Sequence, residues 1–133
     1  MNSLVALDIE TTGLDPERDA ITEIGAVRFS GSRIDAEWST LINPRRPIPP
    51  MISQLTGITN EMVQNAPLLP DVLPNLAEFI GDRSVIGHNV RFDLSFLQQS
   101  HILQSNDVID TYELASVLLP TASRYNLSAL GQI

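Results

Sequence analysis

Apolar residues in the first third of the chain recur in strand-like patterns. Apolar runs rich in β-branched residues at 4–8, 21–29 and 34–42 predict three strands joined by short loops. The segment Ser30–Arg33 separates the second run from the third and is typical of a hairpin turn. The short spacing of these runs favours an antiparallel meander.

The rest of the chain alternates between helical and strand-like patterns. Residues 43–50 are rich in proline and predict an irregular connection. Short helices are expected after it, and Thr59 stands where it would cap one of them. The later elements predicted are a helix at 70–80, a strand at 84–87, a helix at 89–99, a strand at 108–109, a helix at 111–119 and the start of another helix near residue 126. A meander followed by β-α-β units predicts an α/β fold, a mixed five-stranded sheet of three antiparallel and two parallel strands flanked by helices.

Length and composition are those of one ordinary globular domain, spanning 1–133. The 133 residues are enough for a sizeable core, with 43% apolar and 18% charged residues. No apolar run approaches the roughly 18 residues that a membrane span needs, and the N-terminus lacks a secretory signal pattern. The chain has no cysteine, which excludes disulfides, thiolate zinc sites and a cysteine nucleophile. We therefore expect a cytoplasmic protein without membrane contact.

The net charge limits the kind of partner. It is −8, from 8 basic and 16 acidic residues. A protein that holds duplex nucleic acid by its phosphates normally carries a basic surface. The acidity therefore argues against tight non-specific duplex binding, but it does not exclude an enzyme that grips one chain end through metal ions and backbone amides.

Two carboxylates, Asp8 and Glu10, stand where the first predicted strand meets a polar loop. Residues two apart on a strand point to the same face, so both would converge opposite Ile9. Two close carboxylates repel unless a cation lies between them, and hard divalent metals are the usual solution. Taken alone, the pair is also typical of a strand end that enters a polar loop.

A second polar group follows a later predicted strand. Asn89 stands where a helix would be capped, and Asp93 lies one turn further on the same face. Each residue also has a purely structural interpretation. Asp93 alone is typical of a solvated helix position, His88 of a hydrogen-bonded structural histidine, and Phe92 and Phe96 of core packing.

Two segments together resemble the first two motifs of a known family. They are Asp8-Ile-Glu-Thr-Thr-Gly-Leu14 and His88-Asn-Val-Arg-Phe-Asp-Leu-Ser-Phe-Leu97. In this order and separation they are similar to the motifs of the DnaQ-like, or DEDD-type, 3′–5′ exonucleases, which have the ribonuclease H-like fold. Ile48–Met62 resembles the family's sequence before its second motif, and Asp110–Ala122 is similar to the exonuclease domain at the N-terminus of DinG-type helicases. The resemblance extends to the epsilon-like proteins of DNA polymerase III and covers essentially the whole chain.

The resemblance implies a two-metal phosphodiesterase. Asp8, Glu10 and Asp93 would be the catalytic residues and would hold two Mg²⁺ or Mn²⁺ ions at the scissile phosphate. One ion would activate the attacking water, and the other would stabilise the leaving 3′ oxygen. Bound metal would reverse the local field, which makes the acidic charge compatible with a nucleic-acid substrate.

The resemblance also implies a set of substrate contacts. These residues are Thr11, Thr12, Gly13, Leu14, His88, Asn89 and Phe92. Backbone near Thr11 and Thr12 would meet the terminal nucleotide, and Asn89 would assist the phosphate or a metal-bound water. Leu14 and Phe92 would pack against bases, which suits sequence-tolerant binding of single strands. The implied partner is a nucleic-acid 3′ end, single-stranded DNA before RNA, with a linked helicase or a polymerase beyond it.

The chain departs from the family pattern at the third motif, His-x-x-x-x-Asp. The motif's aspartate is the fourth metal carboxylate, and its histidine is the general base. Asp93 follows His88 at the right spacing but already belongs to the second motif, and His101 is followed at that spacing by Asn106. The last predicted helix is cut off at Ile133, so we expect an exonuclease domain incomplete at its C-terminus that is weakly active or inactive alone.

Two alternatives stay open. The chain could be a non-catalytic module that binds nucleic-acid ends or tethers a helicase or polymerase, although such a module would need no carboxylate trio and would usually be more basic. It could also be an RNA-trimming exoribonuclease, because the residues that would contact the sugar do not separate DNA from RNA.

Overall fold

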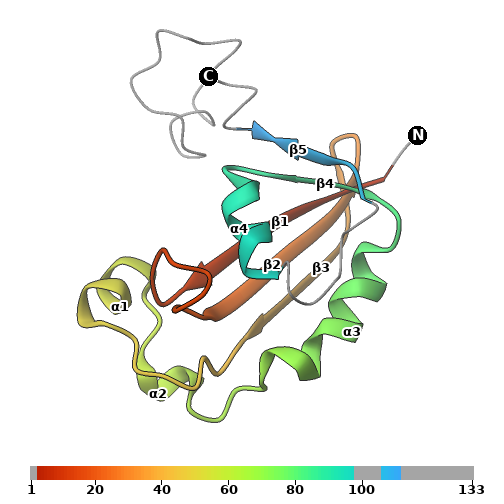
Figure 1. Ribbon diagram of the computed structural model, residues 1–133. Coiled ribbons are helices and arrows are strands. Elements are labelled where there is room, and N and C mark those ends of the chain that lie inside the picture. Colours follow the sequence, from red (N-terminus) through yellow and green to blue (C-terminus); the bar gives the residue numbers. More distant parts are fainter. Residues whose placement is uncertain (1–2, 98–105, 112–133) are drawn as a thin grey trace, which may run out of the picture.

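The computed structural model describes residues 3–97 and 106–111, shown in Figure 1. Its strands are β1 (Leu4–Thr11), β2 (Ile21–Ser30), β3 (Arg33–Leu41), β4 (Ser84–Gly87) and β5 (Val108–Asp110). Its helices are α1 (Pro50–Thr56), α2 (Asn60–Val63), α3 (Leu69–Ile80) and α4 (Val90–Leu97). Every element predicted within these residues is present.

The strands form one mixed sheet in the order β3-β2-β1-β4-β5. β2 pairs antiparallel with both β1 and β3, while β4 pairs parallel with β1 and β5. This confirms the predicted meander with two parallel strands. The first strand was predicted to end at residue 8 but continues to Thr11, because its pairing with β2 runs through Glu10 and shifts register only between Glu10 and Thr11.

Side chains alternate between the two faces of β1. Val5, Leu7 and Ile9 are buried on one face, and α3 and α4 pack against that face of the sheet (Figure 1). Each fully buried Val, Leu or Ile side chain stabilises the fold by about 1.5–3 kcal/mol. The intervening positions, which include Asp8 and Glu10, point to the opposite face. The alternation therefore separates the core from the candidate site.

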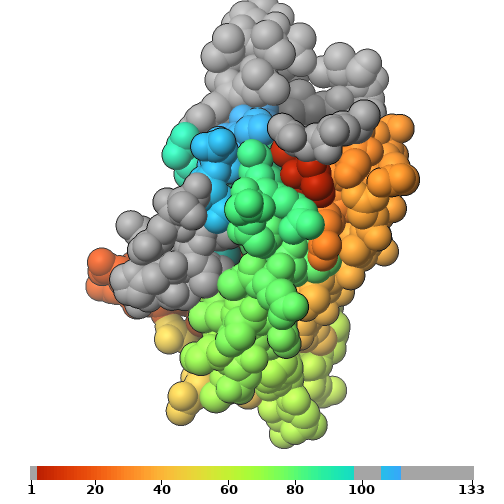
Figure 2. Space-filling model, turned by 90° about the vertical axis from the view of Figure 1, so that its right-hand side faces the viewer, coloured from red at the N-terminus to blue at the C-terminus, as the bar shows by residue number. Residues whose placement is uncertain are grey.

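Helix α3 closes the core with residues spaced as the sequence predicted. Val72, Leu76, Phe79 and Ile80 are buried, as expected for one stripe of an amphipathic helix. The guanidinium of Arg28 in β2 lies 4.5 Å from the centre of the Phe79 ring, a cation–π contact that ties α3 to the sheet. Figure 2 shows the green surface of α3 beside the orange surface of β2 and β3.

A tight turn at His88 and Asn89, directly after Gly87, connects β4 to α4. A Cβ atom at Gly87 would lie 2.8 Å from the carbonyl oxygen of Leu7 and 2.9 Å from Cγ2 of Val90. Both distances are far shorter than ordinary van der Waals contacts, and one is to backbone. The close approach brings the start of α4 against β1, which determines where the side chains of α4 meet the end of that strand.

Gly87→Ala is therefore expected to destabilise the domain by about 2–3 kcal/mol, because the added methyl group overpacks a backbone contact. Urea denaturation followed by circular dichroism measures this effect. Gly25→Ala is the matched control, since a Cβ there would lie 3.9 Å from the nearest atom, the Asp8 carbonyl oxygen. Equal midpoints for the two variants would contradict the close approach.

Part of the sequence prediction lies outside the described residues. This holds for residues 98–99 of the predicted helix at 89–99, for the helix at 111–119 beyond Thr111, and for the helix near residue 126. Among the described helices, none has the length and apolar character to cross a bilayer.

Candidate active site

Strand β1 carries Asp8 and Glu10 on the sheet face opposite the packed helices. Asp8 pairs with Gly25 of β2, and Glu10 pairs with Glu23. Gly25 has no side chain, so nothing from β2 covers the strand beside Asp8. Glu23 and Glu10 are a like-charge cross-strand pair, which is destabilising. The predicted convergence of Asp8 and Glu10 on one face is thus present, with Ile9 buried on the other.

Asp93 reaches the same end of β1 from α4. It is only 5% exposed, and its carboxylate accepts a hydrogen bond from the backbone amide of Ile9. Strand β4 pairs with β1 only as far as Ala6, so Asp93 engages the β1 backbone beyond the point where β4 leaves it. Oδ2 of Asp93 is buried and has no hydrogen-bond partner among the described residues. A buried carboxylate oxygen without a partner is costly and calls for a cation or a proton.

The pKa values reflect carboxylates crowded in a partly desolvated site. Burial, and then the negative charges of Asp8, Glu10 and Asp110, raise the pKa of Asp93 from 3.8 to about 7, against the opposing effect of the Ile9 amide. Burial also raises the pKa of Asp8, although the residue as a whole is exposed to solvent and its carboxylate also accepts from Ile9.

Glu10 behaves in the same way. Its pKa is raised by burial first, then by the charges of Asp8 and Glu23. Each of the three carboxyl groups, Asp8, Glu10 and Asp93, is thus harder to ionise than in water, and Asp8 and Glu10 both act on Asp93 electrostatically. This pattern is typical of functional sites.

The donors suit a hard divalent cation, since all three are carboxylates. Among residues 3–97 and 106–111, however, no three His, Cys, Asp or Glu side chains as they stand are grouped closely enough to hold a metal ion. The electrostatic coupling and the unpartnered Oδ2 of Asp93 fit a metal, while ligation itself stays a prediction.

The predicted substrate segment after Glu10 forms a structured loop. The Thr11 hydroxyl donates to the Gly13 carbonyl at 2.5 Å, and Thr12 is buried with 2% exposure. Leu14 is 83% exposed. Thr12 therefore has a structural role in the loop, and the predicted backbone contact with the terminal nucleotide stays a prediction.

The predicted residues at the start of α4 also hold one another in place. Asn89 has a φ of 53°, in the left-handed region that asparagine tolerates, and its amide donates to Oδ1 of Asp110 at 2.8 Å. Nδ1 of His88 lies 3.3 Å from the Thr111 hydroxyl. Phe92 is half-buried and makes an edge contact with the Phe96 ring at 5.1 Å between centres. These contacts fit the structural interpretation of His88 and leave its role toward substrate untested.

Sequence reasoning missed Asp110 as a contributor to the site. It is 6% exposed, tethers Asn89 and helps to raise the pKa of Asp93. The signal was available, because Asp110 directly follows the strand predicted at 108–109, which in the structure extends to Asp110 and runs parallel to β4. Carboxyl ends of parallel strands lie at the same edge of a sheet, which is where α/β proteins build their sites.

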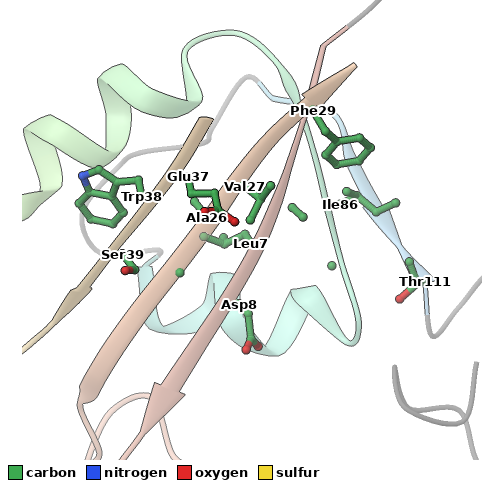
Figure 3. A pocket seen from close by; sticks show the side chains of 13 residues that line it. Leu7, Asp8, Ala26, Val27, Phe29, Glu37, Trp38, Ser39, Ile86 and Thr111 are labelled. Carbon is green, nitrogen blue, oxygen red and sulfur yellow. The ribbon is translucent and has the colours of Figure 1, made fainter. Parts of the chain in front are cut away.

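An open groove of about 560 Å³ lies on the same sheet face as Asp8. Figure 3 shows the Asp8 carboxylate directed away from the apolar side chains of Val27, Phe29 and Ile86. The groove is lined by Ala6, Leu7, Asp8, Gly25, Ala26, Val27, Phe29, Glu37, Trp38, Ser39, Ile86, Gly87 and Thr111. Asp8 thus lies at the edge of this groove, with its carboxylate directed away from the apolar side chains.

A five-stranded sheet of this order, with carboxylates at the end of its central strand, defines the ribonuclease H-like class of nucleases. The chain belongs to the DnaQ-like exonuclease family of hydrolases, since the family model described as RNase T, exonuclease, matches residues 5–132. The family expected from the two motifs is confirmed.

Relatives and solved structures agree with this membership. DNA polymerase III PolC-type of Bacillus subtilis is 39% identical over 132 residues, covering 95% of this chain and 9% of that protein. DNA polymerase III subunit epsilon of Treponema pallidum is 39% identical over 128 residues, covering 92% of this chain and 60% of that protein. The chain thus spans less than two thirds of these relatives.

The structure of exonuclease X in complex with 5′ overhanging duplex DNA superposes with a TM-score of 0.78 at 31% identity, covering 97% of this chain and 71% of that one. Exonuclease I in a product-bound structure gives 0.75 at 17% identity, covering 93% of this chain and 34% of that one, which bears on the fold alone.

Proposed function

We propose that the chain is the core of a metal-dependent 3′–5′ exonuclease acting on single-stranded DNA, with Asp8, Glu10 and Asp93 as metal ligands. Exonucleases of this family use divalent metal ions, and two Mg²⁺ or Mn²⁺ ions are proposed here. The single observation that carries the proposal is the buried Asp93 carboxylate, whose Oδ2 is unpartnered within the described residues while the charges of Asp8, Glu10 and Asp110 act on it. A cation would remove the cost of burying this charge.

Each residue of the proposed site would have a distinct role. Asp8, Glu10 and Asp93 would hold the ions, which when bound polarise the phosphate and supply hydroxide near neutral pH. Ile9 orients the Asp93 carboxylate through its amide, so the ligand needs little reorganisation. Backbone at Thr11 and the adjoining turn would orient the terminal nucleotide.

Base contacts would come from both sides of the carboxylates. Leu14 is exposed on the loop after β1, and Phe92 lies on the first turn of α4, one residue before Asp93. Apolar and aromatic surfaces bind any base through its flat face. His88 and Asn89 would contact the phosphate or the sugar from the turn that precedes α4, and Gly13 would allow close approach of the backbone.

The proposed substrate and partners rest on the relatives. The exonuclease X structure, at 31% identity, holds duplex DNA with a 5′ overhang, which favours DNA over RNA. The polymerase III relatives favour action beside a polymerase, either on the same chain or as a subunit. Linkage to a helicase is a further proposal, which rests only on the sequence resemblance of Asp110–Ala122 to the exonuclease domain of DinG-type helicases.

The 133 residues contain no His-x-x-x-x-Asp motif beyond the one that Asp93 already occupies. A polypeptide of these residues alone is therefore expected to digest a 5′-labelled oligonucleotide in Mn²⁺ only weakly, since general-base catalysis contributes about 10²–10⁴-fold. The digestion rates of a DNA and an RNA oligonucleotide of the same sequence are measured by resolving the products on a denaturing gel. Digestion at the rate of an intact polymerase proofreading subunit would contradict it, and faster digestion of RNA would indicate an exoribonuclease.

A non-catalytic module that binds nucleic-acid ends is the second candidate. The observation that favours it is the spacing of the carboxylates, which do not form a metal cluster as they stand in the described part of the chain. The two candidates differ in metal dependence, because an end-binding module would bind oligonucleotides equally well with and without Mn²⁺.

A further inference from the structure

The Asp19 carboxylate lies at the centre of the loop that connects β1 to β2. Its Oδ1 accepts a hydrogen bond from the Thr12 hydroxyl at 3.0 Å, and its Oδ2 accepts one from the Asp15 amide at 3.0 Å. The Thr12 hydroxyl in turn accepts a hydrogen bond from the Ala20 amide at 3.0 Å. A single side chain therefore ties the beginning, middle and end of the loop together.

Backbone contacts close the same loop. The Thr12 amide donates to the Ala20 carbonyl at 2.8 Å, and the Asp19 amide donates to the Asp15 carbonyl at 2.7 Å. Gly13 lies directly against Asp19, since a Cβ there would stand 2.6 Å from Cγ of the carboxylate. Only glycine fits at this position while Asp19 occupies the centre of the loop.

This loop presents Leu14, four residues after Glu10, with 83% of its surface exposed. Leu14 stands between Gly13 and Asp15, both of which contact the Asp19 carboxylate. The backbone on either side of Leu14 is thus fixed before any ligand arrives. A contact residue that is already ordered loses little conformational entropy on binding.

We propose that Asp19 is a positioning residue that pre-forms the loop and so holds Leu14 against the 3′-terminal base. It acts through Thr12, Gly13 and Asp15, and it determines how tightly the end of the strand is held. The inference rests on the proposed function, because Leu14 meets a base only if a nucleic-acid 3′ end occupies the site.

The test measures affinity and needs no turnover. Two fluorescein-labelled single-stranded DNA octamers are used, one intact and one with an abasic 3′-terminal nucleotide, each with a phosphorothioate at its last linkage. The dissociation constant of each octamer is measured in Mn²⁺ by fluorescence anisotropy. Stacking on one base is worth about 1–3 kcal/mol, so the wild-type chain is expected to bind the intact octamer about tenfold more tightly. Asp19→Ala should reduce this ratio to about twofold or less.

Two variants control for general damage. Glu17→Ala removes an exposed carboxylate of the same loop but keeps the Glu17 backbone amide that donates to Asp15, so its ratio should match wild type. Asp19→Asn keeps an acceptor for the Thr12 hydroxyl and should recover part of the ratio. Hydrogen exchange at the Asp15 amide should be about tenfold faster in Asp19→Ala and unchanged in Glu17→Ala.

The outcomes separate the two proposals. If Asp19→Ala retains the tenfold preference for the terminal base, Asp19 does not position Leu14, and the exonuclease proposal is untouched. If the wild-type chain binds neither octamer in Mn²⁺, the proposed function fails together with the inference. If the wild type binds both octamers equally, the strand end is held without Leu14, and the positioning role is overturned while the metal site stands.

Discussion

Asp8→Asn is expected to lower the Mn²⁺-dependent kcat for single-stranded DNA by about 10³-fold or more, with KM changed less than about threefold. A bound metal lowers the barrier by several kcal/mol, and each 1.36 kcal/mol corresponds to tenfold in rate. Asn keeps the shape of Asp8 but loses the negative charge that would hold the ion. Glu10→Gln and Asp93→Asn should give losses of the same order, since in the proposed metal site the three carboxylates would act as one unit.

Glu37→Gln is the matched control for this series. Glu37 is an exposed carboxylate on the same sheet face, in β3, and lines the groove next to Asp8. Neutralising it should leave kcat within about threefold of wild type. Steady-state kinetics on a labelled oligonucleotide gives kcat and KM for wild type and each variant. A wild-type rate in Asp8→Asn or Asp93→Asn would remove both residues from the proposed metal site.

Asp93→Asn is expected to stabilise the metal-free chain at pH 8, although the proposed function expects it to lower kcat. The pKa of Asp93 is raised from 3.8 to about 7 in the folded protein. The folded state therefore holds a proton that the unfolded state releases between about pH 4 and 7, and stability falls as the pH rises through that window. At pH 8 the ionised Asp93 lowers the free energy of unfolding by at most about 4 kcal/mol, since one pKa unit corresponds to about 1.4 kcal/mol. Structural relaxation around the charge reduces this loss to about 1–3 kcal/mol.

Urea denaturation in EDTA at pH 4, 6 and 8 measures this effect. The stability gained by Asp93→Asn should be close to zero at pH 4 and should grow toward pH 8. Asp82→Asn is the control, because Asp82 is exposed and the same substitution there should have a small effect at every pH. A gain that is the same at all pH values would mean that Asn improves packing and that the charge of Asp93 is not the cause.

The strands and helices of the described chain could be read from apolar spacing. Alternation about Asp8 and Glu10 predicted which face each would occupy, and the sheet order confirms the meander and the two parallel strands. The strand was predicted to end too early because Asp and Glu have low strand propensity, whereas pairing with β2 extends β1 to Thr11. Tertiary pairing outweighed local propensity there.

The details of the site depend on contacts between distant segments. The hydrogen bond from Ile9 to Asp93 joins residues 84 positions apart, and Asp110 tethers Asn89 from 21 positions away. No local pattern encodes either contact. The Asp19 network is local, but its residues are typical of any polar turn, so only the structure distinguishes a loop built around a carboxylate from a solvated one.

Titration with Mn²⁺ by calorimetry, in two buffers of different ionisation enthalpy at pH 6.5, tests the central claim most directly. Wild-type chain should bind the metal and release protons, because the raised pKa of Asp93 leaves much of it protonated at that pH. Asp8→Asn should bind at least about tenfold more weakly, and Asp93→Asn should lose both affinity and most of the proton release. Equal Mn²⁺ binding by wild type and both variants, with no buffer dependence, would contradict a metal site made by Asp8, Glu10 and Asp93.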